Sequence, residues 1–274
     1  MGVNLRDLGA LDGPVLIFGG PSSNLHATRA LLAEAGARGI AGNHLICTGD
    51  TVAYCADPAA TVAALRASGC TVIAGNCEKQ IAAGAPDCGC GFDPGSTCDR
   101  LSAGWFAHAD ANLGPDERHW MAGLADWAVF THQGRRCAVV HGGLSDVARF
   151  LWPGAPEAGF TQEIALIEAA CGPVDMVFAG HCGLAFRQRV GSVEWINAGV
   201  IGIPPNDGTP EVRYAVLSGA EVSIERLRYD HVGARAAMRA AGLTHGYDDA
   251  LTTGYWPSQE VLPPGLRRAA SASG

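Results

Sequence analysis

The sequence lacks an excess of basic residues. It contains 19 lysine and arginine residues against 27 aspartate and glutamate residues, and its formal net charge is −8. Proteins that bind nucleic-acid polymers without sequence preference need basic surfaces that neutralise phosphates. We therefore expect no nucleic-acid polymer among the partners of this chain.

Long apolar runs are also missing. No stretch approaches the roughly 18 apolar residues of a membrane span, and an N-terminus carrying Arg6, Asp7 and Asp12 does not resemble a secretory signal. These absences predict a cytoplasmic protein without a membrane partner; the sequence gives no indication of the oligomeric state. There are ten cysteines, but Cys47, Cys70 and Cys137 lie in or beside expected core strands, where a reduced thiol acts as a small hydrophobe. A disulfide framework is therefore not expected.

Apolar residues are plentiful, at 48% of the 274 residues, which is enough for the core of one large α/β domain. Four short apolar runs each end at a polar side chain that has glycine beside it or close by. Because ligands of open α/β sheets bind at the carboxyl ends of strands, these side chains are candidate site residues. A carboxylate, an amide and two imidazoles suit one divalent ion, namely Mn, Fe(II) or Zn. The four are Asp50, Asn76, His141 and His181.

The order of segments predicts an α/β fold. The strand at Val15–Phe18 precedes a helix beginning near Asn24, and the next strand, ending at Asp50, precedes a helix around Ala59–Ala67. Three later segments are short and closely spaced, which favours antiparallel strands of a second sheet. They are Val193–Asn197, Val212–Leu217 and Val222–Leu227.

Two regions depart from this pattern. Residues 79–135 combine a cysteine-containing, turn-rich loop with two expected helices between Cys98 and Trp127, divided at Gly114-Pro115. We predict a helical insertion beside the site there. The tail at about 264–274 ends in small polar residues and is expected to be mobile.

The order of motifs resembles the calcineurin-like metallophosphoesterases, in particular a bacterial branch with G-D-x-V-G-Y-G-P-D-P after its second strand. The matching run here extends from Gly49 to Pro58 as G-D-T-V-A-Y-C-A-D-P. The family's G-N-H-[DE], H-G and G-H-x-H motifs correspond to Gly75-Asn76-Cys77-Glu78, His141-Gly142 and Gly180-His181-Cys182-Gly183. The later N-P-G-S-V-G corresponds to Asn197–Gly202. The resemblance implies one metallophosphoesterase-like domain over residues 1–274, a four-layer α/β/β/α sandwich of two mixed sheets flanked by helices.

The resemblance also implies half of a two-metal site. In the family, the second metal is held by the residues that correspond to Asp50, Asn76, His141 and His181. The first metal's motif, D-x-H-G-N, falls on Gly20-Pro21-Ser22-Ser23-Asn24, and the last histidine of G-H-x-H is Gly183. One retained metal site is therefore expected, and a second metal is doubtful.

The substrate side of the site changes too. Cys77 takes the place of the histidine in the family's G-N-H motif. Cys77 and Asn24 are the residues expected to face the substrate. Glu78 could orient a metal ligand through a hydrogen bond. Ile203-Pro204-Pro205 takes the place of a Q-P-R segment, which removes an arginine able to pair with phosphate. Arg187 and Arg189 are close to His181 in sequence, although exposed strand charges are the simpler interpretation.

Three functions remain open at this point. The first is a phosphoesterase-like hydrolase that uses one metal and acts on a small phosphomonoester, phosphodiester or nucleotide-type substrate. The second is a catalytically silent member that keeps the metal for binding or regulation. The third is a remodelled metal centre with cysteine ligands, drawn from Cys77, Cys88, Cys90, Cys98 and Cys182, although their spacing matches no common zinc motif.

Overall fold

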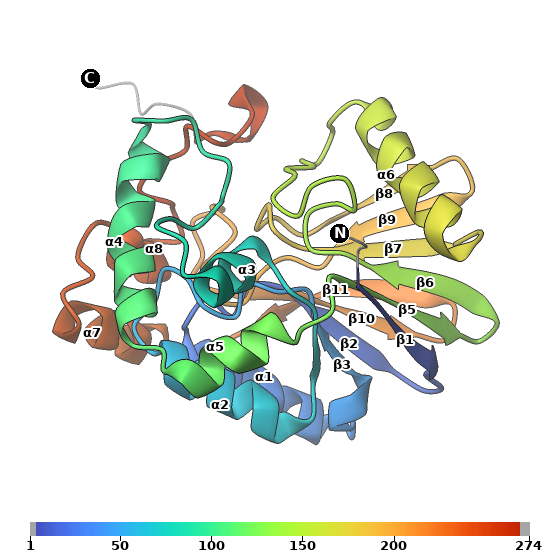
Figure 1. The fold of residues 1–274 in the computed structure, drawn as a ribbon, viewed down its shortest axis with the longest axis horizontal. Coiled ribbons are helices and arrows are strands. Elements are labelled where there is room, and N and C mark those ends of the chain that lie inside the picture. Colours follow the sequence, from blue (N-terminus) through green and yellow to red (C-terminus); the bar gives the residue numbers. More distant parts are fainter. Residues whose placement is uncertain (1–3, 269–274) are drawn as a thin grey trace.

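A computed structural model describes residues 4–268 and confirms the predicted architecture of two mixed sheets packed face to face between helices (Figure 1). The six-stranded sheet has the order β1 (Leu5–Ala10), β5 (Trp127–His132), β6 (Arg135–Val139), β7 (Met176–Ala179), β9 (Val193–Asn197), β8 (Phe186–Val190). The five-stranded sheet has the order β11 (Glu221–Leu227), β10 (Val212–Ser218), β2 (Val15–Phe18), β3 (Leu45–Cys47), β4 (Thr71–Val72).

Strand β2 illustrates why the apolar runs become central strands. All four of its residues are buried, and successive side chains point to opposite faces of the sheet. Ile17 faces the other sheet and packs in the core between them, whereas Leu16 and Phe18 face the helices outside. A sheet covered on both faces needs such uninterrupted apolar strands.

Helices cover the two outer faces. In Figure 1, α1 (Leu25–Ala37) and α2 (Pro58–Ser68) lie below β2 and β3, and α6 (Glu157–Cys171) lies over the six-stranded sheet. Leu31 of α1 joins Leu16 and Phe18 in one apolar cluster, while Phe160 and Ile167 of α6 pack on the six-stranded sheet. The single-turn helix η1 (Gly42–His44) leads directly into β3.

A third group of helices packs beside the sheets and not on them. One apolar cluster joins Ile81, Trp105 and Met238 from three of these helices to Tyr247. The group therefore forms a side wall next to the carboxyl ends of the strands. Its members are α3 (Asn76–Ala83), α4 (Thr97–Ala111), α5 (Pro115–Ala122), α7 (His231–Ala240) and α8 (Tyr247–Thr253).

Some sequence predictions need correction. The three segments expected in a second antiparallel sheet divide between the sheets, because β9 pairs in parallel with β7 whereas β10 and β11 join β2. The predicted insertion at 79–135 extends too far, since its helices end at Ala122 and residues 127–132 form β5. Trp127 begins that strand and does not end a helix.

The C-terminal segment is described only in part. A single-turn helix, η2 (Pro264–Leu266), is followed by Arg267, whose side chain donates to the carbonyl of Leu262 at 2.7 Å. The predicted mobility of the tail therefore concerns mainly residues 269–274, which lie outside the described residues. Within residues 4–268, every helix is too short or too polar to cross a bilayer.

Candidate functional site

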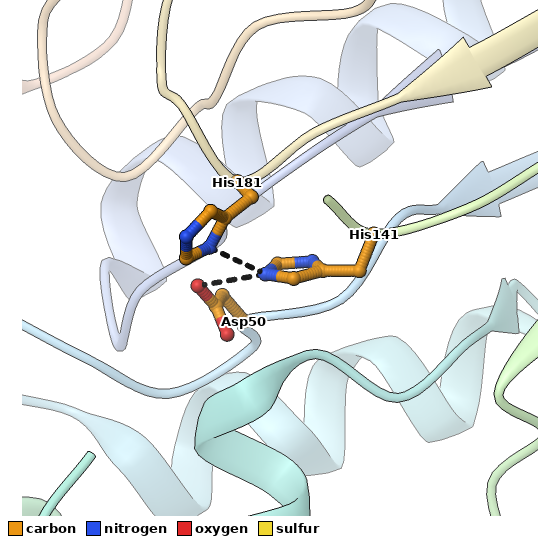
Figure 2. Close-up of side chains that lie close together, drawn as sticks. All are labelled: Asp50, His141 and His181. Atoms are coloured by element: carbon orange, nitrogen blue, oxygen red, sulfur yellow. Dashed lines mark hydrogen bonds and ion pairs between the residues drawn. The ribbon is translucent and has the colours of Figure 1, made fainter. Parts of the chain in front are cut away.

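The four predicted site residues come together at the carboxyl ends of two neighbouring strands from each sheet. Asp50 and Asn76 follow β3 and β4 of the five-stranded sheet, while His141 and His181 follow β6 and β7 of the six-stranded sheet. Potential ligand atoms of Asp50, His141 and His181 all lie within 4.8 Å of one another (Figure 2). Asn76 Oδ1 lies 3.1 Å from His141 Nε2. The structure thus brings all four side chains together, and their role as metal ligands stays a prediction.

Two glycines permit this close packing. A Cβ atom at Gly49 would lie 2.5 Å from the backbone nitrogen of Gly75, and one at Gly75 would lie 2.4 Å from Asp50 Oδ1. Gly49 also has a φ of +100°, which side chains other than glycine rarely adopt. The glycine before Asp50 and the glycine before Asn76 are therefore needed so that the two loops can touch.

The backbone is strained at two of the four residues. Asp50 has a φ of +53° and His181 a φ of +60°, both in the left-handed region. Each such residue costs on the order of 1 kcal/mol, and in a folded protein this strain is held in place by the surrounding packing. Here it directs the two side chains toward His141 (Figure 2).

Hydrogen-bond acceptors converge on one point at this site. His141 Nδ1 lies 2.6 Å from the carbonyl oxygen of Thr48, which fixes the ring proton on that nitrogen. His141 Nε2 then presents a lone pair, and its neighbours are Asn76 Oδ1 at 3.1 Å, His181 Nδ1 at 3.0 Å and Asp50 Oδ2 at 3.3 Å. His181 Nε2 is buried and has no partner within residues 4–268. Asn76 Oδ1, Asp50 Oδ2 and His141 Nε2 thus face one another, with a proton on His181 Nδ1 as the one donor that neutral rings can offer, and the composition of the group fits a divalent ion.

In the metal-free protein the neighbouring charges favour a proton on His141. Burial opposes the charging of His141, but Asp50 raises its pKa above the ordinary value near 6.5. Burial would likewise raise the pKa of Asp50, yet His141 and His181 lower it to about 2. Burial and the neighbouring His141 lower the pKa of His181 to about 3, so that this ring stays neutral.

An incoming cation must displace the His141 proton, and this makes metal binding dependent on pH. We expect the affinity to fall as the pH drops below the raised pKa of His141, by up to about tenfold per pH unit. Competition with a chelating dye at constant ionic strength, from about pH 6 to about pH 8.5, measures this slope. A flat profile across that range would contradict the shared proton.

Glu78 supports the site from behind, as the sequence predicted. Its Oε1 accepts from the backbone N–H and the hydroxyl of Thr51, both at 2.7 Å, and its Oε2 accepts from the backbone N–H groups of Asp50 and Gly75, both at 2.8 Å. Burial raises the pKa of this carboxyl. Because both oxygens already accept two hydrogen bonds, however, no position remains for a carboxyl proton, and we infer that Glu78 is ionised.

The amide of Asn76 is oriented by the cysteine loop. Its Nδ2 donates to the carbonyl of Cys88 at 2.9 Å and lies 3.4 Å from the sulfur of Cys90, which turns Oδ1 toward His141. Cys88 and Cys90 are joined in a disulfide. Within residues 4–268, the one group of at least three His, Cys, Asp or Glu side chains close enough to share an ion contains no cysteine. The structure therefore gives no support to a cysteine-ligated metal centre.

The positions of the lost first-metal ligands are filled by apolar side chains. A Cβ atom at Gly183 would lie 3.2 Å from the indole of Trp256, and one at Gly20 would lie 2.8 Å from Cγ1 of Val200. The indole of Trp256 is fixed by a hydrogen bond of 2.6 Å from Nε1 to the carbonyl of Pro204. Trp256 and Val200 thus lie against Gly183 and Gly20, two of the three positions where first-metal ligands are lost.

A pocket that is partly open to solvent lies next to the four residues. Cys77 lines it, as expected, but Asn24 does not: its Oδ1 caps α1 by accepting from Ala27 N, and its Nδ2 donates to the carbonyl of Gly202. The expectation that Asn24 faces the substrate is therefore wrong, because the start of the helix uses its amide. Arg187 and Arg189 are exposed strand residues, and Arg187 pairs with Glu194.

Sequence reasoning missed the aromatic side chains of this pocket. Phe150, Trp152 and Trp256 line it together with Tyr54 and Trp105. Trp105 packs between the helices and also lines the pocket. No spacing pattern links loops that lie about 100 residues apart, so only the three-dimensional arrangement could reveal this wall.

Comparison with known proteins places these features in a family. The model of the calcineurin-like phosphoesterase superfamily domain matches residues 20–221. No curated protein sequence matches the chain at a significant level. A hypothetical protein from Pyrococcus horikoshii OT3 has a TM-score of 0.71 at 16% identity, covering 89% of this chain and 99% of its own. A metallophosphoesterase from Sphaerobacter thermophilus has a TM-score of 0.65 at 21% identity, covering 89% and 100%. These two structures share the fold, and the domain match shows that the chain belongs to the calcineurin-like phosphoesterase superfamily.

Proposed function

We propose that the protein is a phosphoesterase that hydrolyses a small phosphorylated substrate with one divalent ion, Mn, Fe or Zn, held by Asp50, Asn76, His141 and His181. The observation that carries this proposal is the convergence of Asn76 Oδ1, His181 Nδ1 and Asp50 Oδ2 around His141 Nε2. When both rings are neutral, only His181 Nδ1 can supply a proton to this group, which leaves the two oxygens facing Nε2 without a donor. The family supports the reaction class, because its members carry a metal site at the corresponding motifs.

Each of the surrounding residues has a positioning role in this proposal. Thr48 fixes the tautomer of His141 through its carbonyl, and Cys88 fixes the amide of Asn76 in the same way. Glu78 holds the loops of Asp50 and Gly75 together. A bound divalent ion would lower the pKa of a coordinated water and polarise a phosphoryl oxygen. Hydrolysis would join a water oxygen to phosphorus and break the bond to the leaving oxygen, which would receive the water's proton.

Cys77 does not replace the family's histidine as an acid. Burial, together with the charges of Asp50 and Glu78, raises the pKa of its thiol well above the ordinary value, so that the group is neutral and a weak proton donor at pH 7. We therefore assign Cys77 a packing role in the floor of the pocket.

A catalytically silent, metal-binding protein is the second candidate. It is favoured by the loss of the first-metal ligands at Gly20, Ser22 and Gly183, and by Trp256 and Val200, which fill the space beside Gly183 and Gly20. Two-metal enzymes use ions about 3.5–4 Å apart to activate the nucleophile, and a single ion supplies less of this effect.

Turnover by the reconstituted protein separates the two candidates. The metal-free protein is titrated with Mn, Fe(II) or Zn and assayed on phosphomonoesters, phosphodiesters and nucleotides. We expect activity to rise until about one equivalent is bound and to vanish with a chelator. Asp50→Asn should lose this activity, whereas Asp57→Asn, at the far end of the same loop, should keep it. Stoichiometric binding without turnover of any compound would favour the silent candidate.

A further inference from the structure

Two groups of aromatic side chains, here called walls, line the pocket beside the candidate ion site. In the first wall, the rings of Phe150 and Trp152 stack with an interplanar angle of 3° and centroids 5.0 Å apart, and the centroid of Phe150 lies 4.3 Å from that of the His181 ring. In the second wall, the ring of Tyr54 packs against Trp105 at 4.8 Å and against Tyr247 at 4.5 Å. All five of these aromatic residues line the pocket.

These walls belong to separate parts of the fold. Phe150 and Trp152 lie in the loop between β6 and α6, whereas Tyr54 follows β3 and Trp105 belongs to α4. Phe150 and Trp152 keep part of their surface exposed, although Trp105 is only 4% exposed. Apolar ring surface that is only partly covered at the edge of a pocket favours binding of another flat, apolar group.

The charge of the pocket restricts its ligand further. Among the described residues that line it, none is lysine or arginine, and Asp50 is the one acidic residue. A divalent ion with one carboxylate and neutral imidazoles leaves a net charge of about +1. Glu78 lies behind Asp50 outside the lining, and its charge would reduce this value further. The site therefore complements a singly charged phosphodiester better than a doubly charged monoester or a polyphosphate.

The side chains available to donate a proton in the pocket indicate the kind of ester. In the described residues that line the pocket, the histidines are His141 and His181, both assigned to the ion. No imidazole remains to protonate the leaving oxygen. An aromatic alcohol departs more readily without such an acid than an alkyl alcohol does, because its oxygen has the lower proton affinity.

We propose that the pocket binds the planar aromatic ring of a singly charged phosphodiester by stacking on its aromatic lining, with Trp152 as a main contact. This inference rests on the proposed function and names its substrate class. Hydrolysis joins the water oxygen to phosphorus, breaks the bond from phosphorus to the ester oxygen, and yields a phosphomonoester and an alcohol that has taken up the water's proton. The ring belongs to an aryl leaving group, which the missing acid favours, or to a nucleobase, whose leaving alcohol is the hydroxyl of its sugar. The two rings share the same stacking chemistry.

Ring binding can be tested without the ion and without turnover. The quenching of tryptophan fluorescence by 2-naphthol and by adenosine is measured in the full-length protein with a chelator present, and titration calorimetry checks each affinity. We expect at least one of the two to bind to wild type. We expect Trp152→Leu to weaken that binding about 10- to 100-fold. Trp120→Leu is the matched control, because Trp120 of α5 lies outside the pocket lining.

The outcomes separate this inference from the proposed function. If 2-naphthol alone binds, the substrate is assigned as an aryl ester. If adenosine binds, the bound ring is assigned as a nucleobase. Either result supports the proposal. Failure of both compounds in wild type, or binding of choline in their place, overturns it even if the loaded enzyme hydrolyses phosphoesters. If the protein binds the ring but hydrolyses no phosphoester, the ring-binding pocket is supported and the proposed hydrolase function is not.

The charge argument has its own test. The kcat/KM for an aryl diester should exceed that for the matching aryl monoester by at least about tenfold. A preference for the monoester would overturn that part.

Discussion

Replacing His141 by alanine is expected to remove the bound ion. The ring nitrogen Nε2 lies at the centre of the site, between Asp50, Asn76 and His181. Without this ring, Asp50, Asn76 and His181 surround a space from which the central ligand atom is missing. Loss of a residue that only orients a ligand typically costs 10- to 100-fold in metal affinity, and we expect loss of this ligand to cost more than about 100-fold. Elemental mass spectrometry of protein purified without added metal measures the ion directly.

His132→Ala provides the matched control. Like His141, His132 is buried, and its Nδ1 lies 2.8 Å from a backbone carbonyl, that of Leu11. Both substitutions remove a buried imidazole and leave a cavity, but His132 lies in β5, away from the other ligands. Wild type and His132→Ala should therefore carry about one equivalent, and His141→Ala should carry none. An ion that stays bound after loss of His141 would contradict the assigned ligands.

Replacing Glu78 by glutamine is expected to destabilise both the fold and the site. The carboxylate accepts four hydrogen bonds, three of them from backbone N–H groups. In glutamine the –NH₂ group would face donors, which leaves at least one buried N–H without an acceptor. We expect a loss of about 3 kcal/mol in the free energy of unfolding and a Tm about 6–10 °C lower. Metal affinity should fall about 10- to 100-fold, because Asp50 is no longer held in place.

Thr51→Val separates these two effects of Glu78. It removes one hydrogen bond to Oε1 and leaves the contacts of Glu78 with Asp50 and Gly75 unchanged. We expect a loss of about 1 kcal/mol with nearly unchanged metal affinity. Thermal unfolding and metal titration of both variants, each with and without the ion, test this difference. Equal stability of Glu78→Gln and wild type would contradict the role of the carboxylate.

Much of the site could be predicted because its residues follow apolar runs. Asp50, Asn76, His141 and His181 each come directly after a buried strand, and parallel neighbours end at the same edge of a sheet. Glycines at 49 and 75 also marked the close approach of two loops. The role of Asn24 was predicted wrongly, because an asparagine at the start of a helix serves equally well as its cap.

The parts that were missed depend on contacts between distant segments. Strand β9 is a short, largely buried run like β10, and nothing local in its sequence shows that it pairs with β7. Trp256 lies beyond the last sheet strand, yet its indole lies close to the Cα of Gly183. Such contacts follow from how the chain folds back on itself, which residue spacing does not encode.

The division of the ligands between the sheets has a consequence for unfolding. Asp50 and Asn76 belong to one sheet and His141 and His181 to the other, so a shared ion would act as a reversible cross-link between two halves of the core. An ion that binds only the folded chain at 100 times its Kd adds about 2.7 kcal/mol to the free energy of unfolding. The lifetime of the folded protein would then follow the free concentration of the ion in its surroundings.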